Sequence, residues 1–262
     1  MYTDETWVNA GHTKDKQWHP PDKRRDRGLP HNRGECLIIL HAGCKEHGFL
    51  NNCQLVFQSK SKDNRDYHTE MNGKVFLKWV TKQLIPNLPQ NSVLVMDNAP
   101  YHNLRTVEST SPTSAWRKAD IKDWLDTRNI AYPPNALKPQ LYDIVKLNKP
   151  PIEHEADRLI RAAEHETLRL PAYHCSLNPI ELIWGNLKNR IAMDNSTFKL
   201  NDVRDMVNDG FTRIDQQAWS HAVRHVFDVV EVKYWTDDGL LNVEPVIIHL
   251  GSDDDTDSDD DD

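Results

Sequence analysis

Short apolar runs alternate along the chain with segments whose apolar residues recur at helical spacing, and this pattern predicts a mixed α/β fold. Apolar, β-rich runs predict strands at 35–42, 52–58, 92–96 and 167–170, the last two of them buried. Helical spacing predicts helices at 75–84, 119–126 and 179–192. A short polar connection containing Gly48 joins the first two strands, which should therefore form an antiparallel hairpin.

Further segments are expected around this core. Residues 137–165 predict two short helices broken at Lys149, Pro150 and Pro151, which we interpret as an insertion. Amphipathic patterns at 203–214 and 219–227 predict helices that pack back on the domain. We therefore expect a main domain at 1–192, a helical C-terminal extension at 193–250 and a disordered acidic tail at 251–262.

The net charge of −8 is unusual for a protein that binds DNA, but its source is local. Eight of the 40 acidic residues lie in the tail, so the rest of the chain has as many acidic residues as its 32 basic ones. A neutral body can carry basic patches. The proline-rich loop at 14–33 contains Lys23, Arg24, Arg25 and Arg27, which either follow a DNA backbone or form an ordinary solvated loop.

Cysteine and histidine spacing gives no sign of a zinc site. The four cysteines form no CxxC pair, and we expect buried free thiols in a reducing compartment. His102, His174 and the other histidines lack a paired spacing with an acid, which favours turn or surface roles. No apolar run reaches 18 residues and the start does not resemble a secretion signal, so we expect no membrane segment and no secretion by that route.

Asp97 is the clearest candidate for chemistry. It follows the run VLVM, which places a carboxylate at the exit of a buried strand, where ligands gather in such sheets. Two metal ions held by carboxylates supply what cleavage of a phosphodiester requires. The alternative is an aspartate that only caps the turn before Asn98 and Pro100.

Glu181 is a second candidate, near the start of the helix at 179–192. Its alternative role is structural, because Asn178 is a natural helix cap and Glu181 falls where a capping box would close. Lys188 lies on an adjoining face of the same helix, where it either reaches a phosphate or is an ordinary solvated lysine. Asp4 and Glu5 open the chain beside residues with strand character, although an acidic pair near an N-terminus is usually just exposed.

Together these segments resemble a known family. YTDETWVN, VLVMDNAPYHN and LRLPAYHCSLNPIELIWGNLKNRI closely resemble the three catalytic blocks of the mariner-type DDE superfamily of transposases, including bacterial insertion-sequence relatives. The resemblance runs from residue 1 to about 192. It implies an RNase H-like fold with a mixed five-stranded sheet flanked by helices. It also implies that Asp4, Asp97 and Glu181 are catalytic and bind two Mg²⁺ or Mn²⁺ ions, and that the enzyme nicks element ends and joins the freed 3′ hydroxyl to target DNA.

The resemblance sets further expectations. The resemblance implies DNA as the partner and is compatible with a homodimer. No small-molecule organic cofactor is expected. The protein would be nuclear in a eukaryote and cytoplasmic otherwise. The gap between Asp97 and Glu181, 83 residues, is longer than usual in the family. Because only three residues precede Asp4, we expect an N-terminally truncated chain with weak, sequence-independent nicking at most. The alternative is a domesticated or decayed derivative that binds nucleic acid or a protein partner without catalysis.

Overall fold

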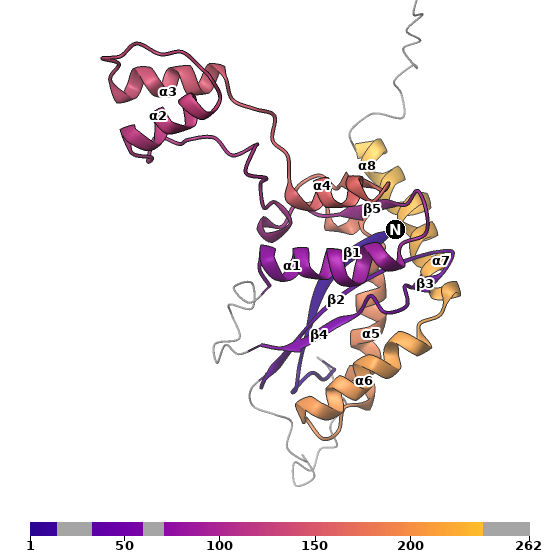
Figure 1. Ribbon diagram of the computed structural model, residues 1–262. Helices are drawn as coiled ribbons and strands as arrows, with labels where there is room; N and C mark the ends of the chain where they lie inside the picture. The colour runs from indigo at the N-terminus through magenta and orange to yellow at the C-terminus, as the bar shows by residue number, and fades with distance from the viewer. Residues whose placement is uncertain (15–32, 60–70, 238–262) are drawn as a thin grey trace, which may run out of the picture.

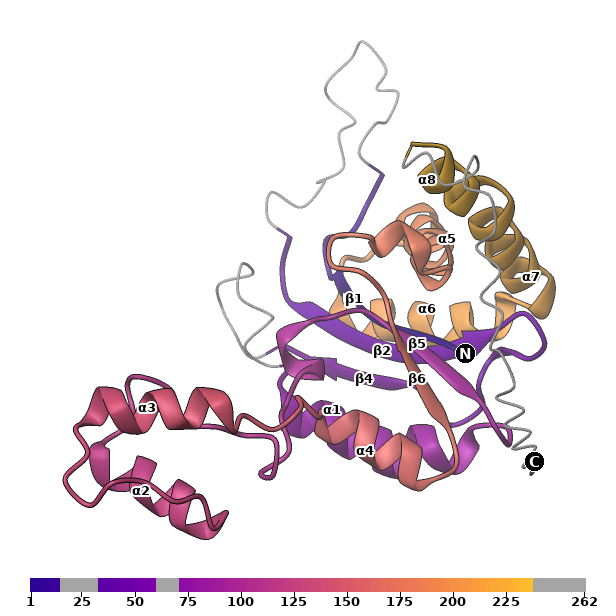
Figure 2. The same ribbon diagram turned by 90° about the horizontal axis from the view of Figure 1, so that it is seen from above.

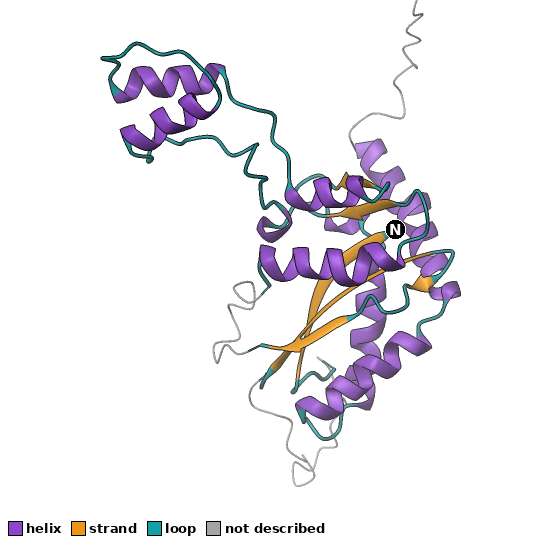
Figure 3. Ribbon diagram, in the orientation of Figure 1, coloured by secondary structure: helices purple, strands orange, loops and turns teal. Residues whose placement is uncertain are grey.

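The centre of the protein is a mixed six-stranded sheet. The computed structural model describes residues 1–14, 33–59 and 71–237. Its strands are β1 (Tyr2–Asn9), β2 (Cys36–Cys44), β3 (Gly48–Phe49), β4 (Leu55–Gln58), β5 (Val93–Met96) and β6 (Glu166–Arg169). The order is β3-β2-β1-β5-β6, and β4 also pairs with β2. Figure 3 shows the strands in orange among the purple helices. The sheet has one strand more than expected, because the turn that reverses at Gly48, with φ of +70°, lets two residues pair with the end of β2.

Strand pairing places the first two candidate acids next to each other. β1 is antiparallel to β2, with Asp4 opposite His41, and parallel to β5, with Tyr2 beside Val95. Asp97 directly follows β5, so it and Asp4 come from neighbouring strands. The predicted hairpin is confirmed, since β2 and β4 are antiparallel.

Helices α5 (Ile180–Asp194), α6 (Leu200–Arg213) and α7 (Gln216–His225) cover one face of the sheet (Figure 2). α7 continues into the π-helical turn η7 (Val226–Glu231) and α8 (Val232–Asp237). Side chains from β1, β2 and the three helices share one buried cluster that includes Val8, Leu37, Trp184, Val207 and Trp219. The helices predicted beyond residue 193 therefore pack back on the sheet, as expected.

The opposite face is covered by α1 (Gly73–Trp79), its continuation η3 (Val80–Leu84) and η4 (Ile85–Asn87), and by α4 (Glu155–Ala162) (Figure 2). The Asn72 side chain caps α1 by accepting from the backbone N–H groups of Lys74 and Val75. The buried cluster on this face includes Leu40, Phe76, Trp79, Leu94 and Ile160.

A small helical lobe projects from the body (Figure 1). It contains α2 (Lys118–Thr127) and α3 (Lys138–Leu147), which bury their own cluster, centred on Ile121, Leu125, Leu141 and Val145. The two connections to the body run side by side, since the N–H of Thr106 donates to the carbonyl of Glu153 over 3.0 Å.

The extent of the inserted segment differs from the insertion expected at 137–165. The second helix of that range, α4, contributes Ala156 and Ile160 to the core under the sheet. The helix near 119–126, expected in the main domain, instead packs with α3 in the lobe. Local amphipathic spacing shows that a helix has a buried face but not which element covers it.

The strand at 167–170 also differs from its prediction. It was expected to be buried, but β6 lies at the end of the strand order and its residues alternate between exposed and half-buried, with Leu168 54% exposed. Three cysteines are buried free thiols as expected, whereas Cys175 is exposed. None of the helices in the described ranges has the length and apolar character needed to cross a membrane.

Candidate active site

The structure brings the three candidate acids of the sequence to one cavity. Asp4 from β1, Asp97 after β5 and Glu181 from the first turn of α5 all line a cavity of about 180 Å³. Trp7 and Tyr101 complete much of its wall. Residues far apart in the sequence meet here because β1 and β5 are parallel neighbours and α5 begins beside β1.

Asn178 fixes the start of α5 against the strand that carries Asp4. Its amide nitrogen donates to the backbone carbonyl of Thr3 over 3.1 Å, and the side chain is buried. The sequence predicted Asn178 as the cap of this helix. In the structure the N-cap of α5 is Pro179, and no side chain caps the helix. The capping-box alternative for Glu181 is therefore wrong, because Oδ1 of Asn178, the atom that would accept from the first turn of α5, makes no hydrogen bond within the described residues.

Crowding of negative charge sets the electrostatics of the cavity. Burial, reinforced by the neighbouring charges of Glu5, Glu181 and Asp97, raises the pKa of Asp4 well above its usual value. Partial burial also raises the pKa of Glu181, with Lys188 opposing the shift and Asp97 adding to it. Two of the three acids are thus held in an environment that disfavours their charged forms.

Asp97 differs from the other two acids because the buried, positively charged imidazole of His102 lies beside it. Its Oδ1 lies 2.7 Å from Nδ1 of His102 and accepts the backbone N–H of Ala99 over 3.0 Å. Burial alone would raise the pKa of Asp97, but the hydrogen bond and charge of His102, aided by Ala99 and Arg169, hold it below its usual value. Asp97 is therefore the carboxylate best kept ionised at neutral pH.

His102 connects Asp97 to Glu5. The ring is 1% exposed, and its Nε2 lies 3.1 Å from Oε1 of Glu5. Although burial works against the charged form, the two carboxylates raise the pKa of His102 to about 10, so the imidazolium persists at neutral pH. The turn or surface role expected for His102 is incomplete: it ends the 3-10 turn η5 (Pro100–His102), but its side chain is deep in the protein.

Lys188 is the remaining charged group at this site. Its Nζ lies 4.9 Å from the centroid of the Trp7 ring, and burial lowers its pKa while Glu181 and Asp4 oppose that shift. The other basic residues proposed for DNA contact, Lys23, Arg24, Arg25 and Arg27, lie outside the described residues. Trp7 is only partly buried, whereas Trp79 and Trp184 are core residues.

With this geometry in place, the comparison with known protein families is decisive. A family model described as DDE superfamily endonuclease matches residues 1–204. The chain belongs to this family.

One solved structure agrees with the assignment at the level of the fold. The crystal structure of the Mos1 strand transfer complex superposes with a TM-score of 0.51 at 14% sequence identity, covering 90% of this chain and 53% of that one. The Mos1 transposase paired-end complex with the left transposon end gives a TM-score of 0.47 at 13% identity, covering 90% and 54%. The match to the strand transfer complex shows that this DDE superfamily member has the RNase H-like fold. The chain spans about half the length of the Mos1 chains. No curated protein sequence matches it.

The donor set of the acidic cavity suits the metals used in the DDE superfamily. Mg²⁺ and Mn²⁺ prefer hard carboxylate oxygens, and the raised pKa values of Asp4 and Glu181 identify a place where added positive charge would be favourable. The residues present fit divalent cations in their chemistry. Within the described residues, however, no three His, Cys, Asp or Glu side chains are already gathered closely enough to hold a metal ion.

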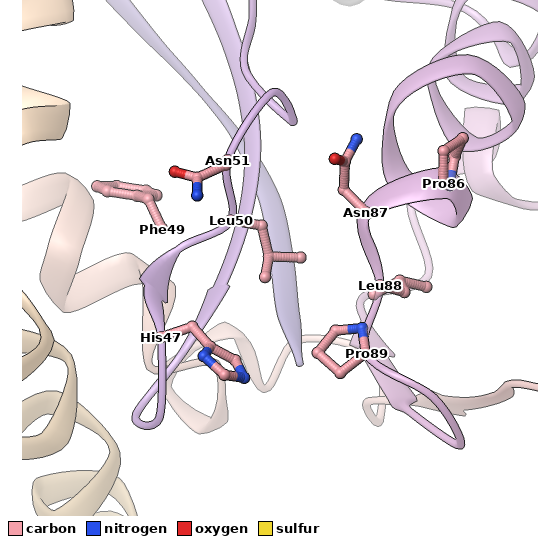
Figure 4. Close-up of a pocket in the computed structure, with 8 residues that line it drawn as sticks. All are labelled: His47, Phe49, Leu50, Asn51, Pro86, Asn87, Leu88 and Pro89. Atoms are coloured by element: carbon pink, nitrogen blue, oxygen red, sulfur yellow. The ribbon is translucent and has the colours of Figure 1, made fainter.

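A larger cavity, of about 390 Å³, lies between β3 and η4. Figure 4 shows its wall, formed from one side by His47, Phe49, Leu50 and Asn51 and from the other by 86–89. Among the described residues, none of the side chains that line it is acidic.

Glu5 and His102 are the functional candidates that sequence reasoning missed. The sequence did contain a signal. His102 follows Asp97 by five residues, a distance that one tight turn closes, and Glu5 adjoins Asp4. That Glu5 reaches His102, 97 positions away, could be known only from the packing of β1 against η5.

Proposed function

We propose that this chain is a metal-dependent DNA-cleaving and strand-transfer domain in which Asp4, Asp97 and Glu181 hold two divalent cations, Mg²⁺ or Mn²⁺. The convergence of the three carboxylates on one cavity is the observation that carries the proposal. The bound cations would activate the attacking oxygen and stabilise the leaving oxygen of a phosphodiester. The similarity to the Mos1 strand transfer complex supports DNA as the substrate.

The chain's own groups have distinct tasks in this proposal. Asp97 is the acid held ionised, so it offers a charged ligand at neutral pH. Positive charge in the cavity would favour the ionised forms of Asp4 and Glu181, whose pKa values are raised by burial and, to a smaller extent, by neighbouring carboxylates. Lys188 remains beside the cavity as a cation suited to a phosphate oxygen.

Plasmid nicking tests the proposal. Purified protein is incubated with supercoiled plasmid and Mg²⁺ or Mn²⁺, beside Asp97→Asn and the control Asp205→Asn, an exposed aspartate on α6. We expect metal-dependent nicking that Asp97→Asn reduces at least about 100-fold and Asp205→Asn leaves unchanged. Nicking that survives Asp97→Asn would show that the reaction does not use this cavity.

The second candidate is a derivative that binds DNA without cutting it. The observation that favours it is the spacing of the acids, since the described residues contain no group of three already gathered around a cation position. Titration with Mn²⁺ separates the candidates, because only the enzyme requires a cation at the carboxylates. The homodimer and the nuclear location expected for a eukaryotic protein stay predictions; light scattering of the purified chain measures the first.

A further inference from the structure

Three charged groups, Glu5, His102 and Asp97, form a line at the acidic cavity, and Glu5 and Asp97 both belong to its wall. Glu5 Oε1 lies 3.1 Å from Nε2 of His102, and Nδ1 of the same ring lies 2.7 Å from Oδ1 of Asp97. Glu5 is 8% exposed and His102 1% exposed in their side chains, whereas Asp97 is 42% exposed. The line therefore runs from Glu5, a largely buried carboxylate of the cavity wall, through the buried imidazole to Asp97, the most exposed of the three.

The imidazole at the centre is held on several sides. Its ring packs at 4.2 Å from the ring of Phe76 and at 4.7 Å from that of Tyr101, measured between centroids. The hydroxyl of Tyr101 donates to Oε2 of Glu5 over 3.2 Å. Because both oxygens of Glu5 are engaged, neither the glutamate nor the ring can turn without losing a buried hydrogen bond.

Arg169 anchors the same turn from the other side. One of its terminal nitrogens donates to the carbonyl of His102 over 3.2 Å and the other to Oδ1 of Asn103 over 2.6 Å. The guanidinium also makes a two-pronged contact with Asp157 on α4, over 2.8 and 3.0 Å. The backbone of η5 is thus fixed to β6 and α4, so the position of the imidazole is set independently of Asp97.

These contacts distinguish the two oxygens of Asp97. Oδ1 pairs with the imidazole of His102 and accepts the backbone N–H of Ala99. Oδ2 has no hydrogen-bond partner in the described part of the chain. We infer that Glu5 and His102 are positioning residues that fix the Asp97 carboxylate so that Oδ2 is the oxygen offered to a divalent cation. This inference rests on the proposed function. Residues behind a metal ligand commonly orient it in this way, and their loss costs about 10- to 100-fold in metal affinity.

A purely structural role for the line makes a different prediction. A buried ion pair that only supports the fold would change stability when broken, but it would leave the cation affinity of the folded protein unchanged. Oriented ligation predicts a loss of affinity at unchanged fold. Oriented ligation also predicts that the effects of the two substitutions on cation affinity are not additive. Removing Glu5 should lower the affinity only while His102 is present to transmit the effect to Asp97.

Mn²⁺ titration followed by electron paramagnetic resonance tests the inference on the full chain. The variants are Glu5→Gln, His102→Asn, the double variant, and the control Glu166→Gln, which removes the same charge from an exposed site on β6. Circular dichroism confirms that each is folded. We expect Glu5→Gln to weaken Mn²⁺ binding about 10-fold, the control to leave it unchanged, and Glu5→Gln to add nothing in the His102→Asn background.

The outcomes separate this inference from the proposed function. If the unaltered chain binds Mn²⁺ and Glu5→Gln binds it equally well, the positioning role is overturned and the carboxylate site remains. Full additivity of the two substitutions would overturn it as well. An unaltered chain that binds no Mn²⁺ would overturn the proposed function and the inference together. If His102→Asn does not fold, the nearly isosteric Glu5→Gln and its control decide the matter.

Discussion

Replacing Asp4 with asparagine should stabilise the metal-free protein while removing a proposed metal ligand. Burial, together with the charges of Glu5, Glu181 and Asp97, raises the pKa of Asp4 well above its usual value. Asparagine has almost the same shape and no charge. The substitution therefore removes repulsion without leaving a cavity, the pattern expected where a site is built for function at a cost in stability.

The pH dependence of this gain has a definite sign. The carboxyl has a higher pKa in the folded than in the unfolded protein, where the usual value is 3.8. As pH rises above that value the unfolded chain ionises first, so the unaltered protein loses stability until the pH passes the folded pKa. The advantage of Asp4→Asn should therefore be small near pH 4 and largest at neutral pH.

The expected size is about 1–2 kcal/mol, the usual gain from relieving strain of this kind at a functional site. Asp4 is only partly buried in β1, so water screens part of the repulsion and favours the lower half of that range. For a chain of this length, each kcal/mol shifts the melting temperature by about 2–4 °C.

Thermal melting in EDTA at pH 4.5 and 7.5 measures the effect, with Asp205→Asn on α6 as the exposed control. We expect the melting temperature of Asp4→Asn to exceed that of the unaltered chain by about 2–6 °C at the higher pH. Excess Mn²⁺ should raise the melting temperature of the unaltered chain more than that of the variant. An Asp4→Asn protein that melts lower at pH 7.5, or a difference that is the same at both pH values, would refute the reasoning.

Three further predictions concern the fold around the site. Replacing residues 107–152 by a short Gly-Ser linker should leave far-UV circular dichroism of the sheet and cooperative melting intact, because the lobe buries its own core and its two connections are already paired. Ile160→Ala on α4 should cost about 2–4 kcal/mol in urea denaturation, whereas Leu147→Ala, 86% exposed, should cost under about 0.5. Burial lowers the pKa of His41 from 6.5 to about 3, so stability should be lost as pH falls below 6.5, by about 2 kcal/mol between pH 7 and 5, and His41→Asn should flatten that slope.

The elements that hold the site could be predicted because local pattern determines them. VLVM is a short apolar run, and it forms β5, with its last three residues buried. The stripe Ile180, Ile183, Trp184, Leu187 and Ile191 predicted the buried face of α5, and all five residues are buried. Local pattern therefore suffices to place Asp97 at the end of a strand and Glu181 in the first turn of a helix.

Elements whose environment depends on distant partners could not be placed in the same way. α4 and α3 are both short helices with an amphipathic pattern, yet Ile160 packs beneath the sheet and Leu141 packs in the lobe. Asn178 has the residue type and position of a helix cap. Its amide nitrogen instead donates a hydrogen bond to the carbonyl of Thr3, 175 positions away. In each case a long-range contact outweighed a local preference that was itself correctly recognised.

The adjacent acids Asp4 and Glu5 show why the site needed the structure to be understood. Consecutive side chains of a strand point to opposite faces, and the even-numbered neighbours Tyr2 and Val8 belong to the cluster under α5. Asp4 therefore belongs to the face of Glu181, while Glu5 reaches His102 on the face covered by α1. Both still line one cavity because β5 ends at Met96 and leaves this part of β1 without a parallel neighbour. Asp4 and Glu5 look interchangeable in the sequence, but the pleat of β1 points them to opposite faces of the sheet. Asp4 is therefore a proposed metal ligand, whereas Glu5 is proposed to orient Asp97 through His102.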